Sequence, residues 1–328
     1  MTPQQPPAFR AQTHIPFWRR TPPAVFPPLM GLFGLALAWG RAVEPFSVPR
    51  AISDLLLGAV ALVFLFALGA YGAKLVKRPG VVVEDLRILP GRTGLAAMSL
   101  CALLLAVGLV PIMPIAAQAL LFAGLAVHLG LAALMIHSLM TSPPEARQVT
   151  PAWHLSFVGF VVAPLSAAPL GFDLLAQALL AGTMAIAALI YGASAAQVLR
   201  RGTPPSLRPL LAIHLAPVCL FGTTAMLLDL TGLAVAFAGL ASAGFVALVL
   251  SARYLTAAGF SALWGAFTFP LAAFSGLMLD LGGQGATFRI VGGVTLVAAT
   301  LLIPWIAAKV LQLWIKGALA VKTNAAVA

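Results

Sequence analysis

Residues 257–279 read AAGFSALWGAFTFPLAAFSGLML, a stretch that contains no Asp, Glu, Lys or Arg. A helix needs about 20 predominantly apolar residues to cross the hydrocarbon core of a bilayer, so this stretch is long enough to span a membrane. Its interior holds Pro270, which removes one helical hydrogen bond and predicts a kink. The stretch therefore predicts a bent transmembrane helix, and similar stretches recur along the chain.

The composition of the whole chain agrees with this interpretation. Of the 328 residues, 61% are hydrophobic and 8% are charged, with a mean hydropathy of +1.04. A soluble domain carries about 25% charged residues, so the composition excludes a soluble enzyme and indicates a polytopic membrane protein. The net charge of +11 follows from the enrichment of Lys and Arg in cytoplasmic loops of membrane proteins. No basic run is dense enough to predict a nucleic-acid partner.

Apolar stretches of spanning length predict one all-helical transmembrane domain, residues 25–315, with ten helices. A short N-terminal tail (residues 1–24) precedes it and a short C-terminal tail (residues 316–328) follows it. Pro111 and Pro114 separate the third and fourth helices, and Asp229 separates the seventh and eighth, because a carboxylate is costly inside a bilayer. The expected helices cover roughly 25–42, 54–76, 94–110, 113–138, 151–171, 174–198, 207–228, 230–252, 257–279 and 289–315.

The basic residues provide an independent test of the number of helices. With the N-terminus inside, ten helices place all 19 Lys and Arg residues on the inner side except Arg41, Arg50 and Arg289. An odd number of helices would mix the two sides and contradict the positive-inside rule. We therefore expect a multi-pass protein of a bacterial cytoplasmic (inner) membrane with both termini cytoplasmic.

Proline distinguishes the odd-numbered from the even-numbered helices. Among the even-numbered helices only the tenth has a proline in its apolar run, whereas prolines open the first and lie within the fifth, seventh and ninth. Each internal proline disrupts the bond to the carbonyl four residues earlier, for example that of Phe160, and such a carbonyl is tolerated in a membrane where protein or water satisfies it. This predicts five helical hairpins whose odd helices line a central wet cavity, although simple kinking is the alternative. These prolines are Pro27, Pro28, Pro164, Pro217 and Pro270.

The lining of this cavity is predicted to be electrically neutral. No Asp, Glu, Lys or Arg lies in the middle third of any expected helix, and no metalloprotease, serine-hydrolase or paired-carboxylate motif is present. No enzyme activity and no cofactor is therefore expected. Cys101 and Cys219 have no metal-ligand spacing and are expected to be small core residues. Four histidines lie in or near the expected helices: His128, His137, His154 and His214. We expect them to have a structural role. The alternatives are a proton relay through His154 or His214 and a haem site.

Several segments resemble one family, the tellurite-resistance/C4-dicarboxylate transporter family, which includes bacterial TehA and the slow-type anion channels of plant guard cells. The matching segments occur in all five hairpins and in the same order, so the resemblance covers the transmembrane region. The most specific is LWGAFTFPLAA at 263–273. The others are PPLMGLFGLALAW at 27–39, EDLR at 84–87, the PAWH…VG…AP pattern at 151–164 and the LRP…LAP pattern at 207–217.

The resemblance implies a quasi-fivefold array of the five hairpins, odd helices inside, assembled as a homotrimer with one pore per protomer. It also implies a gate, because in this family a phenylalanine before the proline of the ninth helix projects into the pore. Phe269 is the matching residue, and Phe267 lies two residues away on another face. The further residues expected to line the pore or to kink its helices are Gly31, Gly34, Gly159, Pro164, Pro217, Thr268 and Pro270.

These features lead to an expected function. The protein is predicted to be a passive anion channel or uniporter in the lipid bilayer, carrying small inorganic or organic anions through a neutral pore that Phe269 closes. The alternative on the same fold is a proton-coupled carrier or exporter of a C4-dicarboxylate, sulfite or tellurite, with His154 or His214 as the proton-responsive residue. A membrane haem protein or enzyme is a third hypothesis, from another class.

Overall fold

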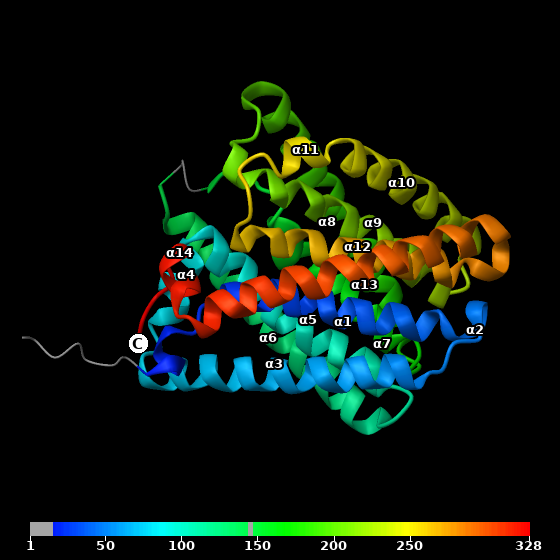
Figure 1. Cartoon of the computed structure of the whole chain (residues 1–328), viewed down its shortest axis with the longest axis horizontal. Coiled ribbons are helices and arrows are strands. Elements are labelled where there is room, and N and C mark those ends of the chain that lie inside the picture. Colours follow the sequence, from blue (N-terminus) through cyan, green and yellow to red (C-terminus); the bar gives the residue numbers. More distant parts are fainter. Residues whose placement is uncertain (1–15, 144–146) are drawn as a thin grey trace, which may run out of the picture.

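The computed structural model describes residues 16–143 and 147–328, which form helices and turns with no β-strand among them (Figure 1). Of the predicted N-terminal tail, residues 1–15 lie outside the described residues. Nine helices in the described part of the chain are long and apolar enough to cross a membrane. The predicted breaks at Pro111–Pro114 and at Asp229 are confirmed. Helix α5 ends at Leu109 before α6 begins at Pro114, and α9 ends at Leu227 before α10 begins at Thr231.

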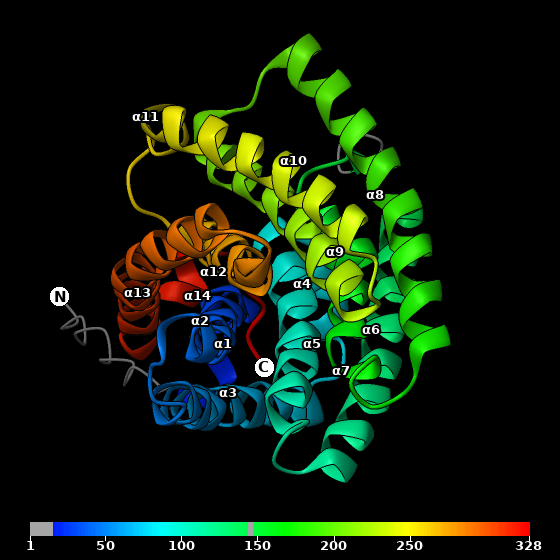
Figure 2. The same cartoon turned by 90° about the vertical axis from the view of Figure 1, so that its right-hand side faces the viewer.

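The nine long helices of the described residues form an inner and an outer set, which alternate along the chain except at residues 114–201, where two outer helices follow one another. In the inner set, between 67 and 78% of the most apolar window is buried, against 17 to 39% in the outer set. Figure 2 shows the outer set around α1, α5, α9 and α12. The inner helices are α1 (Phe26–Arg41), α5 (Leu89–Leu109), α9 (Leu215–Leu227) and α12 (Gly265–Asp280). The outer helices are α3 (Ala51–Lys77), α6 (Pro114–Thr141), α8 (Asp173–Arg201), α10 (Thr231–Leu250) and α13 (Ala286–Ile315).

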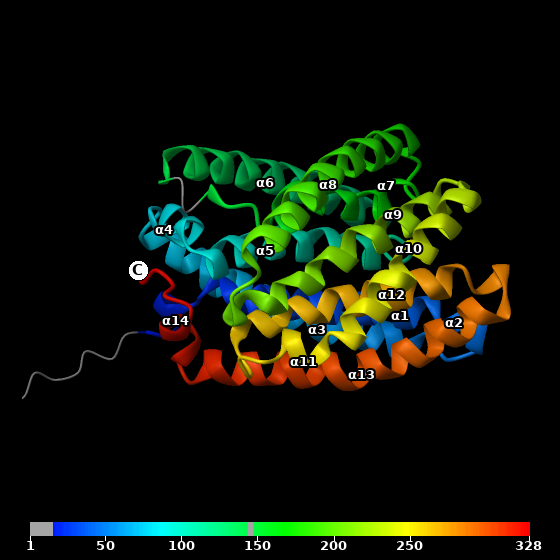
Figure 3. The same ribbon diagram turned by 90° about the horizontal axis from the view of Figure 1, so that it is seen from above.

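Outer helices expose large apolar side chains that water would not tolerate in such number. Leu62 and Phe66 of α3, Leu240 of α10 and Leu301 of α13 are each more than half exposed. Such faces are expected where lipid is the solvent, because burying them against protein is then unnecessary. Seen from above in Figure 3, α3, α6, α8 and α13 run along the molecule beside the inner helices.

A segment of 3₁₀-helix directly precedes three of the inner helices. The preceding turns are η2 (Pro23–Val25) before α1, η6 (Pro205–His214) before α9 and η7 (Ala262–Trp264) before α12. Pro217 is the third residue of α9, which follows directly on η6. Pro270 lies inside α12, which continues as one α-helix from Gly265 to Asp280.

The predicted fifth helix, residues 151–171, is not one continuous α-helix. The chain forms a π-helical turn η4 (His154–Val158), a 3₁₀ turn η5 (Gly159–Val162) and a short α7 (Pro164–Ala167). The 3₁₀ geometry gives the carbonyl of Phe160 a new donor, the N–H of Ala163 at 3.1 Å, because an i→i+3 bond avoids the proline ring. The expectation that this carbonyl lacks a partner is therefore wrong.

Short helices cap the two ends of the bundle. They are η1 (Phe17–Arg20), α2 (Val43–Phe46), α4 (Val81–Arg87), α11 (Ala252–Leu255), η8 (Gly282–Gln284) and α14 (Ala318–Lys322). At the end formed by α2, Arg41 and Asp280 make an ion pair at 2.9 Å that joins the last turns of α1 and α12.

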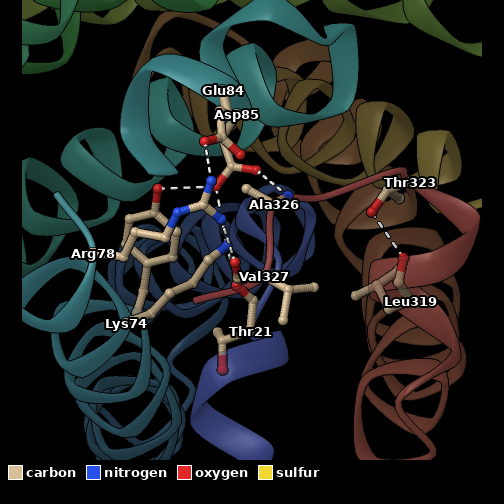
Figure 4. Close-up of polar contacts among 10 residues, drawn as sticks. Thr21, Lys74, Arg78, Glu84, Asp85, Leu319, Thr323, Ala326 and Val327 are labelled. Carbon is tan, nitrogen blue, oxygen red and sulfur yellow. Dashed lines mark hydrogen bonds and ion pairs between the residues drawn. The ribbon is translucent and has the colours of Figure 1, made fainter. Parts of the chain in front are cut away.

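A buried ion pair fixes the opposite end of the bundle (Figure 4). Lys74 of α3 and Asp85 of α4 lie 3.1 Å apart with both side chains fully buried. Lys74 also donates to the carbonyl of Thr21 at 3.2 Å, and Tyr71 donates to the same carboxylate oxygen of Asp85 at 3.1 Å. The second oxygen accepts the N–H of Ala326 at 2.9 Å. One carboxylate therefore joins α3, α4 and the segment after α14.

Candidate functional site

A cavity of about 60 Å³ lies at the centre of the inner helices. Five separate parts of the chain contribute to its wall: η2 with α1, then α5, then η4 with η5, then η6 with α9, and finally η7 with α12. These are the five odd-numbered positions in the order of the predicted helices. The broken segment η4–η5 thus contributes to the wall in the same way as the four longer inner helices.

The wall of the cavity is almost entirely apolar. None of the described residues that line it is Asp, Glu, Lys or Arg, and its polar side chains are those of Thr93 and His154. The hydroxyl of Thr93 bonds within its own helix, to carbonyls of Leu89 and Pro90 at 3.1 and 3.0 Å. Prolines from four different inner segments reach the wall: Pro27, Pro90, Pro217 and Pro270.

Phe269 lines this cavity together with Pro270, and 6% of its surface is exposed. The ring lies against the backbone of α1, since a Cβ atom placed on Gly34 would be 3.0 Å from Cδ2 of Phe269. Glycine therefore provides the space that the ring occupies. The ring stands at a position where it can narrow the cavity, and its neighbour on one side is main chain.

A close approach of α1 and α12 positions this ring. A Cβ atom on Gly31 would lie 2.2 Å from Cβ of Thr268, so only glycine fits there. Thr268 is fully buried, and its hydroxyl donates to the carbonyl of Gly265 at 2.7 Å and lies 3.4 Å from that of Pro27. Gly31 and Thr268 therefore hold the two helices together beside the cavity.

The residues predicted to line or kink the pore thus fall into two groups. Gly159, Pro217, Phe269 and Pro270 line the cavity. The others are absent from its wall: Gly31, Gly34 and Thr268 form the contact between α1 and α12, and Pro164 is buried at the start of α7.

Phe267 has a different environment from Phe269. It is half-buried, does not line the cavity, and packs edge-on against Trp264 with ring centroids 5.6 Å apart. Two phenylalanines separated by one residue of α12 therefore have different surroundings. This makes Phe267 a matched comparison for any substitution of Phe269.

A chain of hydrogen bonds leads away from the cavity wall. Nε2 of His154 lies 2.9 Å from Nδ1 of His214, and Nε2 of His214 lies 2.9 Å from Oγ of Ser194. Tyr191 donates to the backbone carbonyl of His214 at 2.6 Å and packs against the ring of His154, with centroids 4.6 Å apart. Both ring nitrogens of His214 are engaged, which leaves it no free lone pair for a haem iron.

The sequence analysis singled out His154 and His214 but did not predict that their side chains are in contact. They are 60 residues apart and lie in η4 and η6, while Tyr191 and Ser194 come from α8. A hydrophobic helix pattern identifies which residues are apolar, but it does not fix how three helices rotate against one another. Tyr191 and Ser194 were missed for that reason.

A second histidine–serine pair lies at another inner helix. Nδ1 of His128, on α6, is 2.8 Å from Oγ of Ser99, whose hydroxyl donates to the carbonyl of Ala96 at 2.9 Å. This pair does not line the central cavity. No group of three His, Cys, Asp or Glu side chains that could hold a metal ion occurs among residues 16–143 and 147–328.

Comparison with known proteins identifies a family. A family model described as SLAC1, voltage-dependent anion channel, matches residues 20–311. The match begins in η1 and ends in the last turns of α13, so it includes every inner and outer helix and all five parts of the cavity wall. A comparison with curated proteins finds no significant match.

Proposed function

Because the chain belongs to the SLAC1 family of voltage-dependent anion channels, whose members transport anions across membranes, we propose that it is a passive anion channel or uniporter closed by Phe269. The single observation that carries the proposal is the position of this ring, almost fully buried in the wall of an uncharged central cavity. The permeating species are small inorganic or organic anions.

The physical basis of the closed state is dehydration. A cavity of about 60 Å³ holds a few water molecules at most, and an ion loses most of its hydration shell in so small an apolar space. Hydrophobic constrictions close channels in this way, by excluding water. A change in the side-chain rotamer of Phe269 would move the ring away from the cavity and widen it.

The proposal includes an architecture and an assembly. The ten membrane segments form five hairpins in a quasi-fivefold array within one domain, residues 25–315, and η4–η5–α7 is the fifth segment. The burial of the inner helices and the five contributions to the cavity wall support this arrangement. The protein is a homotrimer in a bacterial inner membrane with both termini cytoplasmic, as the family resemblance and the distribution of Lys and Arg favour.

Replacement of the ring tests the gate. In proteoliposomes, Phe269→Ala is expected to raise chloride or nitrate flux at least tenfold, because removing the benzyl group opens the constriction. Phe267→Ala should leave the flux near the wild-type rate, since that ring lies outside the cavity. Equal fluxes in Phe269→Ala and wild type would remove Phe269 from the gate.

A second candidate function is a proton-coupled carrier of a C4-dicarboxylate, sulfite or tellurite. The observation that favours it is the hydrogen-bonded chain from the cavity through His154 and His214 to Ser194. A carrier of this kind would accumulate substrate against its gradient when the outside is acidified, and His214→Phe would abolish that accumulation. A passive channel would dissipate the substrate gradient under the same conditions and accumulate nothing.

A further inference from the structure

Among the described residues of the cavity wall, only His154 has a polar side-chain atom without a partner. It is 2% exposed, and its Nδ1 atom is buried with no hydrogen-bond partner among the described residues. The other polar side chain of the wall, that of Thr93, is satisfied by carbonyls of its own helix. A buried polar atom without a partner is destabilising, so its presence beside a cavity calls for an explanation.

The hydrogen-bond chain determines whether this atom is a donor or an acceptor. The hydroxyl of Ser194 makes no hydrogen bond in the described part of the chain other than that to Nε2 of His214. In either direction the chain leaves one buried donor without a partner, the hydroxyl of Ser194 or the Nδ1–H of His154. Of these two residues His154 lines the cavity, where a ligand can supply the acceptor. We therefore take the direction in which the hydroxyl donates and Nε2 of His214 accepts. A neutral His214 then carries its proton on Nδ1 and donates to Nε2 of His154. His154, whose side chain lines the cavity, then carries its proton on Nδ1.

In the pair formed by His128 and Ser99, the hydrogen bond has the opposite direction, from the histidine to the serine. The hydroxyl of Ser99 donates to the carbonyl of Ala96, so its oxygen accepts the proton of Nδ1 of His128. The remaining nitrogen of His128, Nε2, therefore carries a lone pair and is an acceptor. It is also buried and without a partner. Of the two histidine–serine systems, the one that reaches the central cavity ends in an N–H group.

We infer that the Nδ1–H group of His154 binds the permeating anion, and that Ser194 and His214 are the positioning residues that keep its proton on Nδ1. The inference rests on the proposed channel function and names the contact that the anion makes inside it. A single neutral donor suits a monovalent anion with an acceptor atom, such as nitrate or chloride. The desolvation free energy of an ion rises with the square of its charge, so one N–H group compensates a dianion such as sulfate poorly.

The position of the proton can be measured directly. In the purified full chain labelled with ¹⁵N-histidine, the imidazole spectrum is expected to show both His154 and His128 protonated on Nδ1. The Nδ1–H group of His128 is hydrogen-bonded to Ser99. Adding nitrate to the Phe269→Ala protein should shift the Nδ1–H signal of His154 and leave that of His128 in place. An Nε2–H tautomer of His154, or a signal that nitrate does not move, would overturn the inference.

The two serines provide matched variants for a functional measurement. In the Phe269→Ala background, Ser194→Ala is expected to raise the half-saturating nitrate concentration several-fold and to move the proton of His154 toward Nε2. Ser99→Ala should change neither quantity, although it also removes a hydroxyl bonded to a histidine. A purely structural role for Ser194 would instead leave the tautomer of His154 unchanged in Ser194→Ala.

Substitution of His154 itself completes the experiment. Loss of a hydrogen bond to a charged group predicts a rise of about tenfold or more in the half-saturating nitrate concentration for His154→Phe, with the preference for nitrate over sulfate reduced. His154→Gln retains an N–H donor and should restore part of the affinity. Unchanged affinity and selectivity in His154→Phe would refute the inference while leaving the channel proposal intact. If Phe269→Ala carries no anion flux, the channel proposal fails first, and the tautomer measurement still decides the direction of the chain.

Discussion

Two glycines of α1 determine how closely the helix of the gate can approach. Gly31 faces Thr268, where a Cβ atom would collide at 2.2 Å, and Gly34 faces Phe269, where a Cβ atom would be in tight contact at 3.0 Å. The motif that resembles the family at 27–39 contains both glycines, and the contact explains why small residues are needed there. The resemblance singled out Gly31 and Gly34 but predicted that they line the pore or kink its helices. It did not predict their place in the contact between α1 and α12.

Gly31→Ala is expected to destabilise the protein by about 1–3 kcal/mol, the usual range for overpacking a tight interior. The added methyl group would lie 2.2 Å from Thr268 and force α1 away from α12. Thermal unfolding in detergent should show the loss. Gly58→Ala on α3 is the control, because a Cβ atom there has nothing within 4 Å. An unfolding temperature of Gly31→Ala equal to that of Gly58→Ala would contradict the tight contact.

At the scale of elements, the buried pair of Lys74 and Asp85 attaches α4 to α3. Asp85→Asn leaves the ammonium of Lys74 buried without its counter-charge, so we expect a loss of stability of about 3–5 kcal/mol. The exposed pair of Arg50 and Asp54, 3.7 Å apart, supplies the comparison. Asp54→Asn should change stability by less than about 0.5 kcal/mol.

Thermal unfolding of both variants tests this prediction. The double variant Lys74→Met with Asp85→Leu should regain much of the stability that Asp85→Asn loses, because no uncompensated charge remains. Similar unfolding temperatures for Asp85→Asn and Asp54→Asn would show that the pair does not hold α4 in place.

Hydropathy and turn residues predicted most elements, for physical reasons that the structure makes clear. The thickness of the bilayer sets the length of an apolar transmembrane helix, so hydropathy alone identifies such helices. Nine of the ten expected helices occur as long apolar helices in the described residues. The breaks at Pro111 and Asp229 occur as predicted. The exception is the segment at 151–171. Its hydropathy is that of a helix, whereas the π and 3₁₀ turns around Gly159 depend on packing against Leu100 and His128.

At the scale of the whole molecule, sequence predicted the alternation of buried and exposed helices through the positions of the prolines. It predicted four residues that line the cavity, including Phe269, but not the contacts of His214 with Ser194 and Tyr191. Prolines and charged residues affect the helix in which they lie, so their effects can be predicted from the sequence. Contacts among η4, η6 and α8 depend on the relative rotation of three helices, which no local pattern encodes.

The proposed orientation in the membrane can be tested at the two ends of α13. Gln284 and Lys316 are exposed, one before this helix and one after it. In right-side-out vesicles, a membrane-impermeant maleimide is expected to label Gln284→Cys and not Lys316→Cys. The native cysteines Cys101 and Cys219 are buried and should give little background. Labelling of Lys316→Cys alone would invert the orientation.

The tight contact between α1 and α12 also has a consequence for how the protein responds to heat. If these helices stay together while one ring turns, opening hydrates little additional apolar surface. Heat capacity follows the apolar area that becomes hydrated, so the open and closed states would have nearly equal heat capacities. The logarithm of their equilibrium constant would then vary linearly with reciprocal temperature, whereas helices that part would produce a curve.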